Sequence, residues 1–215
     1  MDIRTFTLSD GTEVPRLGFG TFQLAGEEAY RSCRVALEAG YRHLDTAQGY
    51  GNEAEVGRAL RDSDLDRGEV FLTTKIKPSN ARSRDVRGSI QTSLAELGVD
   101  QVDLVLLHWP AESVAPLSET LGAMNGLVED GLARHIGVSN FPSKMLAHAY
   151  ELAPVVTDQV EHHPFLGVQP IEEVLRSRGG FLTAYSPLAR GKVLDDPVLG
   201  EIGRASCRER VCQYV

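Results

Sequence analysis

The sequence predicts an α/β fold in which parallel strands alternate with helices and close into a barrel. Strand-length apolar runs and helical patterns follow one another along most of the chain, as in repeated strand-helix units. A doubly wound open sheet alternates in the same way, but no Gly-x-Gly-x-x-Gly motif follows the first strand, as a dinucleotide-binding sheet would require. Polar residues at the carboxyl ends of many different strands favour the barrel.

Composition limits the classes of partner. The chain has 215 residues and a net charge of -8, from 30 acidic and 22 basic residues, and its length fits one α/β domain. It has no run rich in Lys and Arg, which argues against nucleic acid or an anionic membrane as a partner. No segment approaches the ~18 apolar residues of a membrane helix, and no signal-peptide core is present. We therefore expect a cytoplasmic protein.

Cysteine spacing gives no sign of a disulfide framework or a metal site. The three cysteines are Cys33, Cys207 and Cys212, and neither metal-ligand nor disulfide spacing links them. We expect reducing conditions and no bound metal.

The expected elements follow in chain order. Residues 6–14 predict a hairpin over one end of the fold, because Ser9-Asp10-Gly11 is a turn signal between two short apolar runs. Seven strands are then expected at residues 17–21, 43–47, 70–76, 102–109, 134–140, 155–161 and 180–186. Six helices are expected between them, at residues 27–39, 52–61, 83–97, 117–129, 144–152 and 171–178. Asn52 is expected to cap its helix, with Glu53 and Glu55 near the positive end of the helix dipole.

Polar side chains end or follow these strands one after another. Such positions gather at one end of a parallel barrel, where catalytic groups are found in this architecture. The residues are Thr21, Asp45, Lys75, His108, Ser139, Asn140, Gln159, Tyr185 and Ser186.

The segment from His43 to Glu53 contains two candidate catalytic residues, Asp45 and Tyr50. Tyr50 stands between Gly49 and Gly51, where a tyrosine ring cannot join strand packing, so its hydroxyl is expected to face a cavity. Asp45 ends the preceding strand. The alternative is structural: an aspartate before a turn often caps it, and a Gly-Tyr-Gly segment is often only a loop.

Lys75 and His108 supply the remaining groups. An ammonium at the end of an apolar strand can pair with Asp45 and favour ionisation of a nearby phenol, which makes that phenol a usable acid. His108 can donate a hydrogen bond or orient a substrate oxygen. Each residue also has a structural alternative: Lys75 can extend its ammonium to solvent, and His108 can be a core histidine with its hydrogen bonds satisfied. That all four residues at neighbouring strand ends have only structural roles is a much poorer explanation.

The sequence resembles the aldo-keto reductases over nearly its whole length, from Phe6 to about Leu199. The motifs that carry the resemblance are GYRHLDTAQGYGNE at residues 40–53, TTKI at 73–76, LLHWP at 106–110, IGVSNF at 136–141, QVEHHP at 159–164 and AYSPLARG at 184–191. By pattern, the chain is most similar to bacterial reductases of the diketogluconate and methylglyoxal type. The resemblance implies a (β/α)8 TIM barrel with an amino-terminal hairpin.

The resemblance also implies the site residues and the cofactor. Its catalytic tetrad falls on Asp45, Tyr50, Lys75 and His108, with Tyr50 as the acid that protonates a carbonyl oxygen as hydride arrives from NADPH. The implied cofactor-binding residues are Thr21, Ser139, Asn140, Gln159, Tyr185, Ser186, Leu188 and Gly191. Phe22 and Trp109 are candidate walls of a pocket for a small carbonyl substrate, although Trp109 could instead pack under a loop. A monomer is expected by likeness.

The resemblance breaks after Gly200. The family continues through a long helix, an eighth strand with a lysine-serine motif and a further arginine, and none of these follows. We therefore expect a truncated barrel domain over residues 1–200, with two exposed strand edges and a tendency to aggregate. Residues 201–215 are expected to be a non-family tail, interpreted as a sequencing artefact because back-translation can reproduce a sequencing adapter. Two alternatives to an enzyme remain: a non-catalytic nicotinamide-binding module and an inactive fragment.

Overall fold

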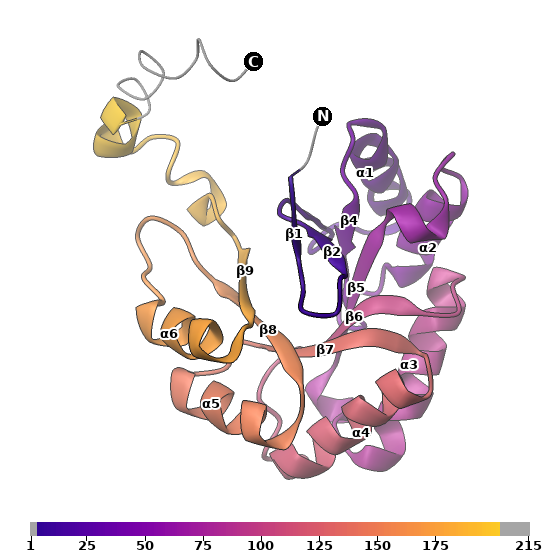
Figure 1. Ribbon diagram of the computed structural model, residues 1–215. Coiled ribbons are helices and arrows are strands. Elements are labelled where there is room, and N and C mark those ends of the chain that lie inside the picture. The colour runs from indigo at the N-terminus through magenta and orange to yellow at the C-terminus, as the bar shows by residue number, and fades with distance from the viewer. Residues whose placement is uncertain (1–3, 203–215) are drawn as a thin grey trace.

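A seven-stranded parallel sheet forms the centre of the molecule. The computed structural model describes residues 4–202, and its strands lie in the sheet in chain order, from β3 to β9. Their bounds are β3 Phe19–Gly20, β4 His43–Asp45, β5 Phe71–Ile76, β6 Val102–Leu107, β7 Ala133–Ser139, β8 Val155–Glu161 and β9 Phe181–Tyr185. The sheet curves into a nearly closed barrel (Figure 1), which confirms the predicted fold class.

Within residues 4–202, the six helices α1 to α6 lie on the outer side of this sheet (Figure 1). Their bounds are α1 Gly26–Glu38, α2 Glu53–Arg61, α3 Ser83–Leu97, α4 Leu117–Glu129, α5 Ser143–Leu152 and α6 Gln169–Arg178. Helix α3 ends at Gly98, whose φ of 68° is the left-handed conformation that glycine adopts without strain. The main apolar core lies between the helices and the outward side chains of the strands.

Alternation along β5 explains why one lysine points inward. All six residues of β5 are buried, and successive side chains of a strand point to opposite faces. Leu72 and Ile76 belong to the outer core against the helices, whereas Phe71 packs inside the barrel with Val14 and Leu104. Lys75 shares the face of Phe71, so its side chain enters the barrel lumen.

The predicted hairpin closes the amino-terminal end of the barrel. It consists of β1 Thr5–Thr7 and β2 Glu13–Pro15, paired antiparallel. The rings of Phe6 and Phe181 lie 4.8 Å apart, and Thr12 hydrogen-bonds His135 at 3.1 Å. Phe181 is the first residue of β9, so the hairpin covers the ends of the strands opposite those predicted to carry the site.

One side of the barrel is open. Within residues 4–202, β3 and β9 each pair with a single neighbour in the seven-stranded sheet and do not pair with each other. Both expected strand edges are therefore present, and the tendency to aggregate stays a prediction. The expected tail, with Cys207 and Cys212, lies outside the described residues apart from its first two positions.

The start of α2 differs from its expected form. Asn52 occupies the N-cap position, but its side chain makes no cap hydrogen bond. Its amide nitrogen instead donates to the backbone oxygens of Thr21 and Leu24, both at 2.9 Å. Glu53 is 3% exposed, so it is a buried group and not a solvated carboxylate at the helix end. Tertiary contacts outweigh the local capping preference here.

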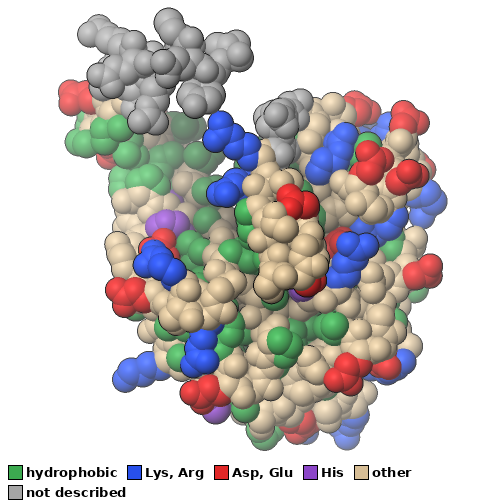
Figure 2. All heavy atoms as spheres, in the orientation of Figure 1, with side chains coloured by type: hydrophobic (Ala, Val, Ile, Leu, Met, Phe, Trp, Pro, Cys, Tyr) green, Lys and Arg blue, Asp and Glu red, His purple; other side chains and the backbone are tan. Residues whose placement is uncertain are grey.

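The surface charges are mixed. Figure 2 shows acidic and basic side chains interspersed over the face in view, without a large patch of one sign. Within the described residues, none of the helices has the length and apolar content needed to cross a lipid bilayer.

Candidate active site

Three consecutive strands bring the predicted catalytic groups together. Asp45 is the last residue of β4, Lys75 is the penultimate residue of β5, and His108 directly follows β6. The parallel register pairs Asp45 with Thr73 and Lys75 with Leu106, so the three side chains share one end of the barrel. Tyr50 reaches the same end from the loop that follows β4.

Lys75 is completely buried and its ammonium has three oxygen neighbours. It forms an ion pair with Asp45, donates to the backbone oxygen of Thr46 at 2.9 Å, and lies 3.3 Å from the hydroxyl oxygen of Tyr50. An ammonium has three protons to donate, and burying it without partners would be costly. The arrangement therefore holds a charged ammonium beside a phenol.

Tyr50 lies between two further rings. Its ring centroid is 5.5 Å from that of His108 in an edge contact and 5.1 Å from that of Phe22. Burial and then the positive charge of Lys75 lower the pKa of His108 to about 4, against the opposite effect of Asp45. The imidazole is therefore neutral near pH 7 and carries one N–H donor.

Gln159 on β8 reaches across the lumen to the same cluster. Its amide nitrogen donates to the second carboxylate oxygen of Asp45 at 2.7 Å. Ser139 donates from its hydroxyl to the backbone oxygen of Gln159, also at 2.7 Å. Gln159 keeps its amide oxygen as a further acceptor, so it can hold Asp45 and bind a second group together.

Asn140 connects Tyr185 to the same end of the barrel. Its backbone has a φ of 63°, a conformation that non-glycine residues adopt rarely and at a cost. Its amide donates to the backbone oxygen of His108 at 3.0 Å and accepts from the Tyr185 hydroxyl at 2.8 Å. These contacts hold the unusual backbone in place, and they fix the Tyr185 ring at the wall of the lumen.

A cavity of about 800 Å³ runs along this end and the open side of the barrel. Trp109 and Phe22 line it and are 50% and 60% exposed. Leu188 and Gly191 are absent from the wall that the described residues form, while Lys75 lies beneath it. The predicted site residues in its wall are Thr21, Phe22, Asp45, Tyr50, His108, Trp109, Ser139, Asn140, Gln159, Tyr185 and Ser186.

Two residues at the site were not predicted as site residues from the sequence. Arg190 lines the cavity from a segment with left-handed backbone, and its φ is 54°. Asn52 lies behind the site, where it accepts from the Thr46 hydroxyl at 2.7 Å. Neither has a distinctive signal in one sequence, since arginine is common at surfaces and asparagine before a helix predicts a cap.

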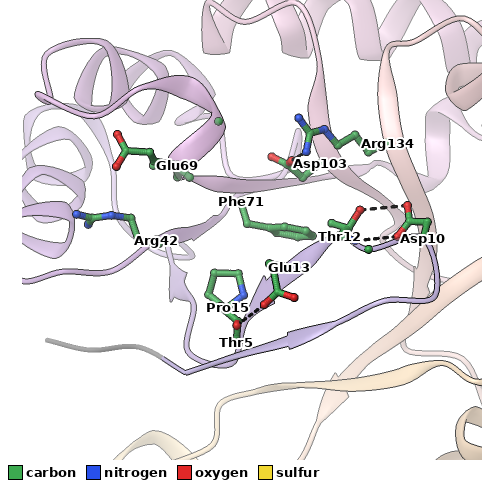
Figure 3. A pocket seen from close by; sticks show the side chains of 13 residues that line it. Thr5, Asp10, Thr12, Glu13, Pro15, Arg42, Glu69, Phe71, Asp103 and Arg134 are labelled. Atoms are coloured by element: carbon green, nitrogen blue, oxygen red, sulfur yellow. Dashed lines mark hydrogen bonds and ion pairs between the residues drawn. The ribbon is translucent and has the colours of Figure 1, made fainter.

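A second cavity, of about 470 Å³, lies beneath the hairpin. Figure 3 shows Asp10 and Thr12 of the hairpin on the side of Arg134, whereas Glu13 points toward Thr5, from which it accepts a hydrogen bond. Arg134 pairs with Asp103 at 3.5 Å, and Asp10 accepts from the backbone of Thr12 at 3.0 Å. Its charged groups are used within the fold, and none of the predicted catalytic residues lines it. Within residues 4–202 no cluster of His, Cys, Asp and Glu is suited to a metal ion.

Comparisons with known proteins agree with these motifs. The family model described as the aldo/keto reductase family matches residues 16–204. An aldo-keto reductase of Mycolicibacterium vanbaalenii is 41% identical over 209 residues, which are 96% of this chain and 75% of the relative.

Solved structures extend the likeness to the fold. A chain assigned as 2,5-diketo-D-gluconic acid reductase B has a TM-score of 0.89 and 45% identity, over 94% of this chain and 73% of that chain. An aldo/keto reductase from Brucella melitensis also has a TM-score of 0.89, at 37% identity, over 96% of this chain and 80% of that chain. The protein therefore belongs to the aldo/keto reductase family, whose members are oxidoreductases that act on carbonyl compounds.

Proposed function

We propose that the protein reduces aldehydes and ketones to alcohols with NADPH, and that Tyr50 donates the proton. The observation that carries this proposal is the hydroxyl of Tyr50 at the cavity wall, 3.3 Å from the buried ammonium of Lys75. In this position the hydroxyl can donate its proton to a group bound in the cavity, and the ammonium can stabilise the negative charge that proton transfer leaves on the oxygen.

Each residue of the cluster has a role in this proposal. Tyr50 transfers its proton to the carbonyl oxygen, Lys75 stabilises the resulting phenolate, and Asp45 holds the ammonium in place. His108, neutral near pH 7, donates a hydrogen bond that positions the carbonyl oxygen. When bound, the nicotinamide supplies the hydride to the carbonyl carbon.

The far side of the cavity suits a nicotinamide. Ser139, Asn140 and Gln159 present hydroxyl and amide groups to the cavity wall, and a carboxamide needs both donors and acceptors. Tyr185 offers an aromatic face next to them, and flat rings pack well on such a face. We assign the cofactor role to these four residues with Thr21 and Ser186, and propose Leu188 and Gly191 as neighbours of the pyrophosphate.

The substrate wall is apolar. Trp109 and Phe22 stand at the cavity mouth with large exposed faces, and Phe22 packs against the ring of Tyr50. These residues favour a small carbonyl compound that has an apolar or flat group next to the reacting carbon. Methylglyoxal and simple aldehydes are the first substrates to test.

The decisive experiment measures NADPH consumption with methylglyoxal, with Tyr50→Phe as the control. We expect turnover in the parent and a loss of about 10²- to 10⁴-fold in kcat in the variant, the usual value of a positioned acid. Trp109 is the only tryptophan and lines the cavity, so its fluorescence reports nucleotide binding in both proteins. Binding without turnover in the parent would favour the non-catalytic module, and neither signal would favour the inactive fragment.

We further propose that the enzyme is a cytoplasmic monomer that prefers NADPH to NADH. Cys33, the free cysteine of the described residues, is buried, which suits a reducing compartment. Light scattering at several concentrations tests the monomer, and the ratio of kcat/KM for the two nucleotides tests the preference. A dimer that forms as the concentration rises would contradict the monomer, and a kcat/KM higher with NADH than with NADPH would contradict the preference.

A further inference from the structure

The loop that carries Tyr50 contains two glycines, which do not restrict the backbone by themselves. It spans residues 46–52 between β4 and α2, and Gly49 and Gly51 flank the tyrosine. Gly51 has a φ of 65°, and glycine restricts a backbone least of all residues. The position of Tyr50 relative to Lys75 therefore depends on contacts of its own ring with Phe22 and His108 and on the residues that attach the loop on either side of the glycines.

Gln48 fixes the loop on its amino-terminal side. Its backbone nitrogen donates to the backbone oxygen of Lys75 at 3.2 Å. Its side-chain oxygen accepts from the backbone nitrogen of Lys77 at 3.1 Å and from the amide of Asn80 at 3.0 Å. Gln48 is thereby attached to the chain at Lys75 and just beyond it.

Glu53 fixes the loop on its carboxyl-terminal side. Its carboxyl group accepts from the hydroxyl of Thr74 at 2.5 Å, and Thr74 directly precedes Lys75 on β5. Glu53 is 3% exposed, and burial raises the pKa of its carboxyl group. The two ends of the loop are thus attached to β5 on either side of Lys75.

Ser93 of α3 joins the two attachments. The amide of Gln48 donates to the Ser93 hydroxyl at 3.3 Å, and the single proton of that hydroxyl is shared between Glu53 at 3.2 Å and the backbone oxygen of Ser89 at 3.3 Å. Ser93 is 1% exposed. One buried hydroxyl therefore links Gln48 to Glu53 behind the loop.

We propose that Gln48, Glu53 and Ser93 are positioning residues that hold the Tyr50 hydroxyl against the Lys75 ammonium. The inference rests on the proposed role of Tyr50 as proton donor. None of the three lines the cavity, so they act only through the position of Tyr50. Val56, Ala59 and Leu60 bury the inner face of α2, so apolar packing also holds this helix, and the three polar residues are the ones that attach the Tyr50 loop to β5 and α3.

The test is Ser93→Ala in the full chain. Alanine is the best helix former, so α3 is retained while the hydroxyl that joins Gln48 to Glu53 is lost. We expect kcat for methylglyoxal to fall about 10- to 100-fold, the usual effect of a displacement of about 1 Å at a reacting group. The KM for NADPH and its binding, measured by Trp109 fluorescence, are expected to stay unchanged.

Ser89→Ala is the matched control on the same helix. The Ser89 hydroxyl donates only to the backbone of Val86, one turn back, at 2.9 Å. We expect its kcat to equal that of the parent. An equal loss in both variants would overturn the inference, because it would show a general effect of altering α3.

Glu53 provides a second, independent pair of variants. Glu53→Gln keeps one acceptor for Thr74 and places an amide toward Ser93, so kcat is expected to stay within about threefold of the parent. Glu53→Ala removes both contacts, and we expect the same loss as in Ser93→Ala. If Ser93→Ala folds poorly, Gln48→Ala at its half-buried loop position is used in its place, with the same expected loss.

A double variant separates this inference from the proposed function. In the Tyr50→Phe background, Ser93→Ala is expected to cause no further loss, because residues that act as one unit are not additive. If Tyr50→Phe is inactive and Ser93→Ala keeps the parent kcat, the positioning role is wrong and the proposed function stands. If Tyr50→Phe keeps the parent activity, the proposed function fails and the inference fails with it.

Discussion

Gln159 on β8 and Asp45 on β4 are joined across the barrel lumen by a hydrogen bond of 2.7 Å. The two residues lie far apart in the chain and on opposite walls of the barrel. The same carboxylate pairs with Lys75, which lies beside Tyr50. A continuous chain of polar contacts therefore runs from the proposed nicotinamide site to the proposed proton donor.

Replacing Gln159 by Glu is expected to damage this chain severely. The change places two carboxylates side by side, and like charges about 4 Å apart repel by roughly 4 kcal/mol at an effective dielectric constant of about 20. We expect kcat/KM for NADPH-dependent reduction to fall by at least about 10²-fold. Gln159→Ala, which removes the donor without adding charge, is the control in steady-state kinetics and is expected to lose less. Equal losses in the two variants would contradict this explanation.

Protonation of His108 is expected to destabilise the protein in acid. Its pKa is lowered to about 4 in the fold, from an ordinary value of 6.5, so the unfolded chain binds the proton first as pH falls. The contribution of this group to the free energy of unfolding is therefore complete above pH 6.5 and is lost between pH 6.5 and about 4.

Two measurements check this expectation. An NMR titration of the imidazole is expected to show no change of charge near pH 6.5, and urea unfolding is expected to show less loss of stability in His108→Asn than in the parent over that range. A midpoint near 6.5 in the folded protein would disprove it.

Asp158 is expected to make the protein less stable as pH rises. It is fully buried on β8, and one of its carboxyl oxygens has no hydrogen-bond partner among the described residues. Burial raises the pKa of Asp158 to about 7, against a weaker opposite effect of the Phe141 backbone. Between pH about 4 and about 7 the unfolded chain releases this proton and the folded chain keeps it, so stability falls across that window.

Asp158→Asn tests this effect with a neutral side chain of the same shape. At pH 8 we expect its free energy of unfolding, measured with urea, to exceed that of the parent by on the order of a few kcal/mol. At pH 4 we expect the two free energies to differ little. Asp64→Asn, at an exposed position, is the control and is expected to leave the pH dependence unchanged. A variant that is less stable than the parent at pH 8 would refute the prediction.

Gly57 is expected to tolerate no side chain. A Cβ atom at this position in α2 would overlap the backbone carbonyl of Leu97 at the end of α3, and overpacking against backbone costs about 1–3 kcal/mol. Gly57→Ala is therefore expected to lower the thermal midpoint. Gly122→Ala in α4 is the control, because a Cβ atom there meets nothing within 4 Å and alanine favours a helix over glycine by about 1 kcal/mol. Equal midpoints in the two variants would contradict the close approach of α2 and α3.

Elements with both an apolar period and an end signal could be predicted from the sequence alone. Helices α3 and α4 have the expected bounds, Ser83–Leu97 and Leu117–Glu129, because Gly98 and Gly131 follow them and both have a positive φ. The strand order also follows from alternation, since successive strands of a parallel barrel are neighbours.

Contacts between distant segments could not be predicted in this way. The bond between Gln159 and Asp45 depends on barrel closure, and no local pattern carries it. Asn52 and Glu53 have the sequence of a capped helix start, but their side chains are used by Thr21 and Thr74. The motifs give the order of the site residues along the chain, whereas the hydrogen bonds between them depend on how the strands meet around the barrel.

In the part of the chain that the structure describes, the unpaired side of the barrel gives two parts of the site different support from neighbouring strands. Asp45, Lys75 and His108 lie on or next to β4, β5 and β6, which are paired with one another in the sheet. Their spacing therefore cannot change without breaking hydrogen bonds between these strands. Within residues 4–202, Tyr185 ends β9, which pairs with β8 alone. The wall proposed to contact a nicotinamide ring therefore depends on β8 and on the Asn140–Tyr185 hydrogen bond for its position, whereas the groups proposed to handle the proton are supported by strands on both sides.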